Sequence, residues 1–410
     1  MNYPVIVVAA YSRSVALSRL LGSINRAIFP TADHRLIISI DGGGGESVVE
    51  VAKEFNFVSG TTEVVTRDCN IGLREHILWC GGLSEKYGSV IVLEDDLIVA
   101  PLFYHYASEA DNYYSAFQEV AGIALYSPVY NEVNNLPFQP MQTNCCIFFM
   151  QVPCSSGQLW NYSQWRDFKE WYLNFGTNID LNEIINLPDI AKKWPQSSWK
   201  KYFYAYIATT GKYIVYPYNS YTSNCSDPGG THVSLGSNMF QVPLSSSSCL
   251  PNVMNFIAPN DMDVQYDSFS EPASPEMFRY LGLNVGDVEI DLHGAKPLSL
   301  LNSKNYVLTS RRQKTYVKKF FLAFKPIEKF YLAEAEECLG FSRDSIAIYL
   351  VKSTQLEYTK PPTYSLLRYY YCSPFATLPF LCGFALELTA KLLSRLKSVF
   401  SLVLRSGSKL

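Results

Sequence analysis

The feature that most constrains this chain is an acidic triplet that directly follows an apolar run. Residues 89–93 (Ser-Val-Ile-Val-Leu) predict a buried strand, and Glu94, Asp95 and Asp96 come immediately after it. Three adjacent carboxylates at the end of a buried strand are costly unless a cation shares the site. Open α/β sheets bind ligands at this edge, and carboxylate oxygens suit Mg²⁺ or Mn²⁺, which can hold a diphosphate. The alternative is a solvated strand end followed by loop acids.

Strand-like and helix-like segments alternate along the N-terminal third of the chain. Apolar, β-branched runs predict strands at residues 3–11, 35–40, 63–66 and 89–93. Helical spacing of apolar residues predicts helices at 15–28, 46–55, 74–87 and from Pro101 onward. Such alternation predicts an α/β fold with a mostly parallel central sheet and helices on both faces.

Three segments in this third resemble the GT-A glycosyltransferases, and most of all the N-acetylglucosaminyltransferase I type. They are residues 4–14 (Pro-Val-Ile-Val-Val-Ala-Ala-Tyr-Ser-Arg-Ser), 37–43 (Ile-Ile-Ser-Ile-Asp-Gly-Gly) and 90–101 (Val-Ile-Val-Leu-Glu-Asp-Asp-Leu-Ile-Val-Ala-Pro). The third segment is the most specific. A weaker likeness at residues 198–217 and 229–232 extends the resemblance to about residue 235. It implies a Rossmann-like GT-A fold and a metal-dependent enzyme that uses a nucleotide sugar.

The resemblance implies a role for each of five residues. Asp96 would bind Mn²⁺ or Mg²⁺, Asp95 would face the ribose, and Glu94 would face the transferred sugar. Asp41 would read a uracil base, and Arg13 would pair with phosphate. Two alternatives remain open: Asp41 as an ordinary turn former before glycines, and Arg13 as a surface residue in the first turn of a helix. The helix dipole makes that turn a poor place for a cation.

His232 ends a segment rich in turn residues, at positions 224–232. A glycine-rich loop that ends in histidine suits closure over a diphosphate or an added metal ligand. The alternative is an ordinary surface histidine in a loop.

The catalytic base is the least determined part of the predicted site. Inverting transfer needs a carboxylate that takes the proton of the acceptor hydroxyl. In the resembled family acids directly follow a tryptophan, but here Trp199 is followed by Lys200 and Lys201. Asp167 and Glu170 lie nearby and three residues apart, so they can share a helix face, and each is a candidate base or a solvated helix acid. The surrounding tryptophans line an acceptor cleft or merely pack; they are Trp160, Trp165, Trp171, Trp194 and Trp199.

Length and composition predict further organisation. We expect a GT-A domain at residues 1–250 (nucleotide-sugar half 1–126, acceptor half 127–250) and a linker with a mixed or helical accessory region at 251–373. A run of Lys and Arg among aromatic residues at 304–329 predicts a basic amphipathic element. Residues 374–410 predict a helix with a leucine-rich half and a basic half, suited to an anionic membrane surface. The alternatives for that helix are docking on its own domain or an oligomer contact.

Other properties exclude some classes. The net charge of −3 argues against a nucleic-acid partner. The ten cysteines include no Cys-x-x-Cys pair, which argues against structural zinc and predicts reduced thiols. No segment offers the roughly 18 apolar residues of a membrane span. The N-terminus has no evident secretory signal, so we expect a cytoplasmic bacterial enzyme, because the eukaryotic relatives carry an N-terminal anchor.

The sequence thus predicts a glycosyltransferase that moves a sugar from a nucleotide diphosphate donor to a saccharide of a bacterial surface glycan. The donor is expected to be UDP-linked, with UDP-GlcNAc as one candidate, and the resemblance favours inversion. The acceptor is a saccharide or a lipid-linked saccharide, and the oligomeric state stays open. Two other classes compete: a nucleotidyltransferase that makes an activated sugar, and a non-catalytic glycan-binding protein. The first usually has a glycine-rich N-terminal signature with a lysine, which residues 9–13 lack.

Overall fold

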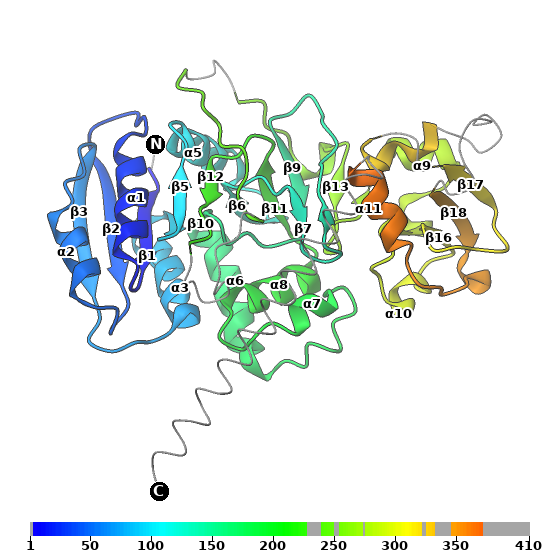
Figure 1. Ribbon diagram of the computed structural model, residues 1–410, viewed down its shortest axis with the longest axis horizontal. Coiled ribbons are helices and arrows are strands. Elements are labelled where there is room, and N and C mark those ends of the chain that lie inside the picture. Colours follow the sequence, from blue (N-terminus) through cyan, green and yellow to red (C-terminus); the bar gives the residue numbers. More distant parts are fainter. Residues whose placement is uncertain are drawn as a thin grey trace, which may run out of the picture.

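The computed structural model describes residues 3–227, 239–249, 254–273, 275–321, 325–332 and 346–371. Most of the first 273 residues are built around one ten-stranded sheet, shown in Figure 1. Its strand order is β14-β13-β9-β11-β6-β10-β4-β1-β2-β3. A smaller four-stranded sheet follows in the C-terminal part of the chain. His232 and residues 374–410 lie outside the described residues.

The N-terminal half of the large sheet is parallel. Its strands are β1 (Val5–Ala10), β2 (His34–Ile40), β3 (Gly60–Thr66) and β4 (Ser89–Glu94). β1 lies between β2 and β4 and is parallel to both. Every residue of β1 is buried, as its continuous apolar sequence requires for a strand covered on both faces. The strands predicted at residues 3–11, 35–40, 63–66 and 89–93 are confirmed.

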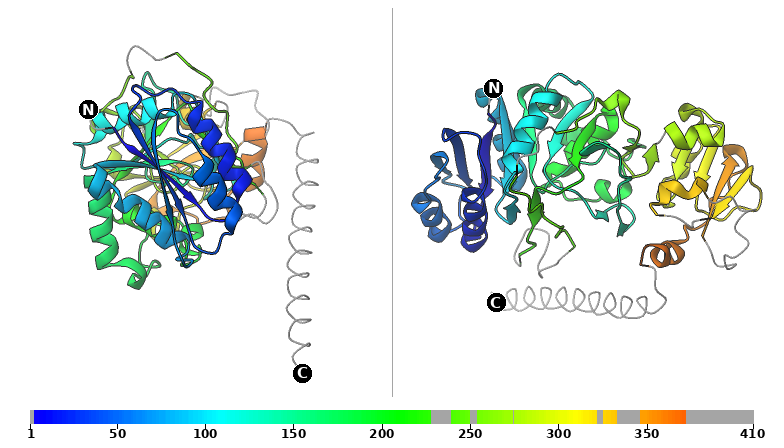
Figure 2. Two further views of the ribbon diagram at one scale, coloured as in Figure 1. Left: turned by 90° about the vertical axis from the view of Figure 1, so that its left-hand side faces the viewer. Right: turned by 90° about the horizontal axis from the view of Figure 1, so that it is seen from above.

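Helices cover both faces of this half, as Figure 2 shows from the side. α1 (Ser14–Asn25) packs on α2 (Glu46–Glu54). α3 (Leu73–Gly82) and α4 (Ser84–Tyr87) join α6 (Tyr162–Asn174) and α8 (Trp199–Thr210) in a second layer. Right-handed crossovers explain why the two helix layers lie on opposite faces of the sheet. The chain moves outward from β1 to β3, and it then returns across the sheet to β4. The predicted α/β fold, with helices on both faces, is confirmed.

The second half of the sheet mixes parallel and antiparallel pairs. It contains β6 (Val120–Ala124), β9 (Ile147–Met150), β10 (Gln158–Asn161), β11 (Tyr213–Pro217), β13 (Gln265–Tyr266) and β14 (Pro272–Ala273). β10 lies antiparallel between β4 and β6. Since β13 and β14 belong to this sheet, the sheet extends beyond residue 250.

Shorter elements complete this part of the chain. Two separate pairs are β5 (Leu97–Val99) with β12 (Thr222–Asn224), and β7 (Tyr130–Asn131) with β8 (Leu136–Pro137). The remaining helices are α5 (Phe103–Tyr114), α7 (Asp189–Lys192), η1 (Gly176–Asn178) and η2 (Pro259–Asp261). The β7–β8 pair forms a tight hairpin, which we call the 130–137 hairpin.

The described part of residues 275–371 forms a C-terminal unit with its own apolar core. Its strands are β15 (Val288–Asp291), β16 (Tyr306–Thr309), β17 (Lys318–Phe321) and β18 (Ala347–Lys352). Its helices are α9 (Pro275–Leu281), α10 (Leu298–Leu301), α11 (Thr363–Tyr371), η3 (Val285–Asp287), η4 (Ile327–Leu332) and η5 (Ser353–Gln355). The predicted mixed accessory region is confirmed. The basic run at 304–329 is not one amphipathic element, because its described residues include two strands and a buried Arg311.

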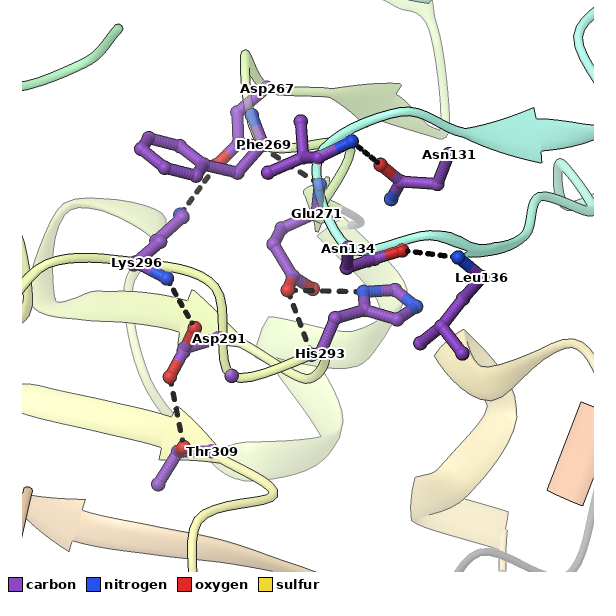
Figure 3. Close-up of polar contacts among 12 residues, drawn as sticks. Asn131, Asn134, Leu136, Asp267, Phe269, Glu271, Asp291, His293, Lys296 and Thr309 are labelled. Atoms are coloured by element: carbon purple, nitrogen blue, oxygen red, sulfur yellow. Dashed lines mark hydrogen bonds and ion pairs between the residues drawn. The ribbon is translucent and has the colours of Figure 1, made fainter. Parts of the chain in front are cut away.

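A mostly buried set of charged residues joins the large sheet to the C-terminal unit, and Figure 3 labels Asp267, Glu271, Asp291, His293 and Lys296 of this set. We call it the junction network; its members are these five residues and Arg311. Arg311 Nε donates to Asp291 Oδ2 at 2.9 Å, and both side chains are almost fully buried. Glu271 accepts from the His293 backbone N–H at 2.8 Å. The two sheets are therefore connected by ion pairs as well as by apolar packing.

Among the residues that the structure describes, no helix has the length and apolar character needed to cross a membrane.

Candidate active site

The acidic triplet lies where the sequence predicts it, at the carboxyl end of β4. Glu94 is in register with Ala9 of the neighbouring parallel strand. The Asp95 backbone N–H donates to the Ala9 carbonyl at 3.1 Å, so strand pairing continues one residue past the end of β4. Asp95 is buried. The sheet itself thus fixes the directions of the three carboxylates.

Arg13 is the cation that shares this edge. It is the N-cap residue of α1, and its guanidinium donates to Asp95 Oδ1 and, at 3.2 Å, to Asp96 Oδ2. From the sequence, Arg13 could also have been a surface residue. Its ion pairs with two aspartates instead explain why a cation is found at the positive end of a helix dipole. One guanidinium neutralises part of three clustered carboxylates, which is the compensation that their burial requires.

Glu94 has the most perturbed carboxyl at this edge. Burial, followed by the charges of Asp96 and Asp95, raises its pKa to about 8, while Arg13 and Lys200 lower it. Glu94 therefore carries its proton at neutral pH. A neutral carboxyl can donate a hydrogen bond, which an ionised one cannot.

Asp96 carries the observation most relevant to a metal. Its Oδ1 is buried and has no hydrogen-bond partner among the described residues. A buried acceptor without a partner is unusual and calls for an unseen ligand or a functional reason. Within the described ranges, no group of three or more His, Cys, Asp or Glu residues could hold a metal ion. Mg²⁺-type ions are often bound by one or two carboxylates, with phosphate and water as the other ligands, so Asp96 fits a metal that arrives with a diphosphate.

A loop from the second half of the sheet reaches the same edge. β12 pairs antiparallel with β5, which begins directly after Asp96. The Cys225 backbone N–H donates to the Asp96 carbonyl at 2.8 Å, and Arg19 of α1 holds Asp227 with two hydrogen bonds. Arg19 lowers the pKa of Asp227 by this pairing. The chain beyond Asp227 therefore starts beside the triplet, but His232 lies outside the described residues and its predicted role stays a prediction.

A cavity of about 450 Å³ opens at this edge. Arg13, Glu94 and Asp96 line it, together with residues of the 130–137 hairpin, of α7 and α8, and of the segment between these two helices. The residues from these other elements include Glu132, Ile190, Trp194, Trp199 and Lys200. A mostly apolar hollow with a few convergent polar groups is typical of a small-molecule site. Of the five tryptophans considered from sequence, Trp194 and Trp199 line the cavity. Trp199 is nevertheless buried in the core, as are Trp160, Trp165 and Trp171.

Asp41 lies at the end of β2 but does not line this cavity. Its carboxylate accepts from three backbone N–H groups, those of Gly42, Ile71 and Gly72, at 2.9–3.0 Å. It therefore ties the glycine loop after β2 to the turn before α3. Gly42 is needed there, because a Cβ on it would lie 2.3 Å from the Cys69 carbonyl carbon. The role of Asp41 in reading a uracil base stays a prediction. In the structure its carboxylate already shapes the loop.

Asp167 and Glu170 lie on α6 and do not line the cavity. Asp167 pairs with Lys212 at 2.8 Å and with Arg166 at 3.1 Å. The Glu170 side chain is 69% exposed. The structure thus does not bring either predicted base to the triplet.

The structure instead brings Glu132 into the cavity, a residue that the sequence did not single out. Glu132 pairs with Lys200, with 2.7 Å between Oε1 and Nζ. Its neighbours Asn131, Asn134 and Asn135 are residues that favour turns, but no spacing rule connects a turn at this position to α8. The lysine at position 200, where the resembled family has an acid, was the one signal that an acid must come from elsewhere.

Comparisons with known proteins give only distant likenesses. No protein-family model and no curated protein matches this chain. The 1–349 fragment of S. aureus TarS is 12% identical with a TM-score of 0.35, over 53% of this chain and 59% of that fragment. PcManGT, a mannosyltransferase from Pyrobaculum calidifontis solved with GDP-Man and Mn²⁺, is 10% identical with a TM-score of 0.35, over 56% of this chain and 59% of that chain. The chain thus covers about 59% of the length of these relatives. At such TM-scores the likeness carries no argument, and the site geometry has to carry the proposal.

Proposed function

We propose that this chain is a glycosyltransferase of the GT-A type that transfers a sugar from a nucleotide diphosphate donor to a saccharide. The observation that carries the proposal is the carboxyl edge of β4. There the Asp96 oxygen that has no partner among the described residues, the cation of Arg13 and the carboxyl of Glu94 line one cavity. A diphosphate with a divalent cation supplies the charges that complete this set. A glycan-binding protein has no use for such a buried charge arrangement.

Each residue at this edge would have its own role in the transfer. Asp96 would hold the metal, which when bound neutralises charge on the departing diphosphate. Arg13 can release part of its contact with Asp95 and Asp96 and donate to a phosphate oxygen. Glu94 donates its proton in a hydrogen bond to a hydroxyl of the transferred sugar. Trp194, which is only partly buried, offers an apolar plane against which an acceptor sugar ring can pack.

Finer points of the proposal rest on the sequence resemblance. They are a UDP-linked donor, UDP-GlcNAc among the candidates, Asp95 at the ribose, inversion at the anomeric carbon, and a surface glycan of a bacterium as product. His232 as a loop residue near the diphosphate belongs with them. The helix predicted at residues 374–410, as a peripheral membrane contact, is another such point. Co-sedimentation with anionic liposomes tests it.

The test of the proposed activity is to identify which nucleotide product leaves. Purified protein is incubated with Mn²⁺ and a panel of UDP-, GDP- and dTDP-sugars, with and without saccharide acceptors, and products are separated by chromatography. We expect release of a nucleoside diphosphate from at least one donor. Release of pyrophosphate from a nucleoside triphosphate and a sugar phosphate would indicate a nucleotidyltransferase. Binding of glycans with no released nucleotide would indicate a non-catalytic protein.

A further inference from the structure

The proposed transfer needs a group that accepts the proton of the acceptor hydroxyl. Among the described residues, four carboxyl groups line the cavity: those of Glu94, Asp96, Glu132 and Asp227. Asp96 is paired with Arg13 and has the oxygen suited to a metal, and Asp227 is paired with Arg19. Glu94 belongs to the same triplet as Asp96, at the end of β4. Glu132 comes from a different element, the 130–137 hairpin, and lines the cavity together with Trp194 and Lys200.

Lys200 holds Glu132 in place. Lys200 is the second residue of α8, a helix whose N-cap Ser198 side chain accepts from the Lys201 backbone N–H. The Lys200 ammonium lies 5.1 Å from the centre of the Trp194 ring and 2.7 Å from Glu132 Oε1. A carboxylate has two oxygens, so the second can accept a hydrogen bond from a hydroxyl of a sugar that packs on Trp194.

Glu94, Glu132 and Lys200 line the same cavity as Arg13 and Asp96. A transferred sugar that touches Glu94 would therefore lie in the cavity into which Glu132 also reaches.

The 130–137 hairpin, which carries Glu132, packs against the C-terminal unit. Leu136 is almost completely buried and belongs to the same apolar cluster as Met277, Phe278 and Leu366. Figure 3 shows Asn131, Asn134 and Leu136 of the hairpin beside Glu271 and His293 of the junction network. Within the hairpin, the Leu136 backbone N–H donates to Asn134 Oδ1 at 3.0 Å. The position of Glu132 thus depends on residues more than a hundred positions further along the chain.

We propose that Glu132 is the catalytic base of the transfer, and that Lys200 and the C-terminal unit act as positioning elements for it. This inference rests on the proposed glycosyltransferase function. In the step, the acceptor O–H bond breaks and its proton passes to the Glu132 carboxylate. The hydroxyl oxygen forms a bond to the anomeric carbon, and the bond from that carbon to the diphosphate oxygen breaks, with the electron pair leaving on the nucleoside diphosphate.

The decisive variant is Glu132→Gln, which keeps the side-chain shape and removes the basic oxygen. We expect transfer turnover to fall about 100-fold or more, with the donor KM and nucleotide affinity unchanged. Glu132→Asp should recover part of the lost turnover, because it restores a carboxylate. The matched control is Glu85→Gln, which breaks an exposed pair with Lys169 on the surface and should leave turnover at the wild-type level.

Lys200→Gln tests positioning separately from chemistry. We expect a smaller fall in turnover than in Glu132→Gln, together with a raised acceptor KM and an unchanged donor KM, because the carboxylate loses the ammonium that orients it. A merely structural role would lower the folded fraction without changing the acceptor KM of the protein that remains folded.

These experiments test the assignment of Glu132 as the base separately from the proposed glycosyltransferase function. If the wild-type protein releases no nucleoside diphosphate from any donor, the proposed function fails. If the wild type transfers sugar and Glu132→Gln keeps wild-type turnover, only the assignment of the base is overturned. A large loss in Asp167→Asn or Glu170→Gln, with Glu132→Gln active, would return the base to α6.

Discussion

Two clusters of charge in this molecule use the same residue types in opposite ways. At the end of β4, one guanidinium pairs with two of the three acids, and two of the three line a cavity. At the junction network, His293, Lys296 and Arg311 each pair with an acid between the two sheets. Asp96 and Asp291 represent the contrast, since each follows or ends a buried strand and each pairs with an arginine.

The difference between them lies in what each carboxylate still lacks. Asp291 accepts from the Lys296 backbone N–H, the Thr309 hydroxyl and Arg311, and so uses both oxygens. Asp96 accepts from Arg13 through Oδ2, while its buried Oδ1 has no partner among the described residues. A satisfied buried carboxylate indicates a structural role, and an unsatisfied one beside a cavity indicates a ligand.

The largest effect is expected from Asp291→Asn. The substitution leaves the buried guanidinium of Arg311 without a negative partner, and breaking a buried pair in this way typically costs about 3–5 kcal/mol of unfolding free energy. Denaturant unfolding followed by circular dichroism measures it. Nucleotide binding should be retained in the folded fraction, because the cavity is lined by other residues. A loss well below about 1 kcal/mol would contradict the view of this network as a structural connection.

A second effect concerns pH and Glu94. Its folded-state pKa of about 8 lies above the ordinary value of 4.5, so between these values the folded protein binds more protons than the unfolded chain. Stability must then fall as pH rises through this window. Between about pH 5.5 and about pH 7.5 the Glu94 contribution reaches at most about 2–3 kcal/mol.

Glu94→Gln removes this contribution. The difference in unfolding free energy between the variant and the wild type should therefore grow with pH, in favour of the variant. The junction carboxylates are unchanged in both proteins and cancel in the comparison. A difference that stays constant across this range would show that Glu94 is ionised in the folded state.

Much of the fold could be predicted from local sequence. Continuous apolar runs such as residues 5–8 belong to strands buried on both faces, and they appear at the predicted places. The acidic triplet was predictable as a site because burial makes three adjacent acids informative by themselves. The pairing of Arg13 with two of these acids agrees with the inference that its position at a helix start needs a special reason.

The rest depends on contacts that sequence spacing does not report. Asp167 and Glu170 share a helix, as expected, but α6 directs them to Arg166, Lys212 and solvent. Glu132 lines the cavity from a hairpin whose Leu136 is buried in a core otherwise made by residues after 275. Arg311, within a basic run typical of a solvated face, is buried by its pairing with Asp291. Each case requires tertiary packing of distant segments.

The central claim is that the unpartnered Asp96 oxygen belongs to a site for a metal-bound nucleoside diphosphate. Calorimetry of UDP and GDP binding, with and without Mn²⁺, to the wild type and to Asp96→Asn tests it most directly, with unfolding free energy measured on the same samples. We expect Mn²⁺ to strengthen nucleotide binding to the wild type only. The variant should lose that gain while its stability stays within about 1 kcal/mol of the wild type. Equal Mn²⁺-assisted affinity in both proteins would contradict the claim, and so would a variant as unstable as Asp291→Asn.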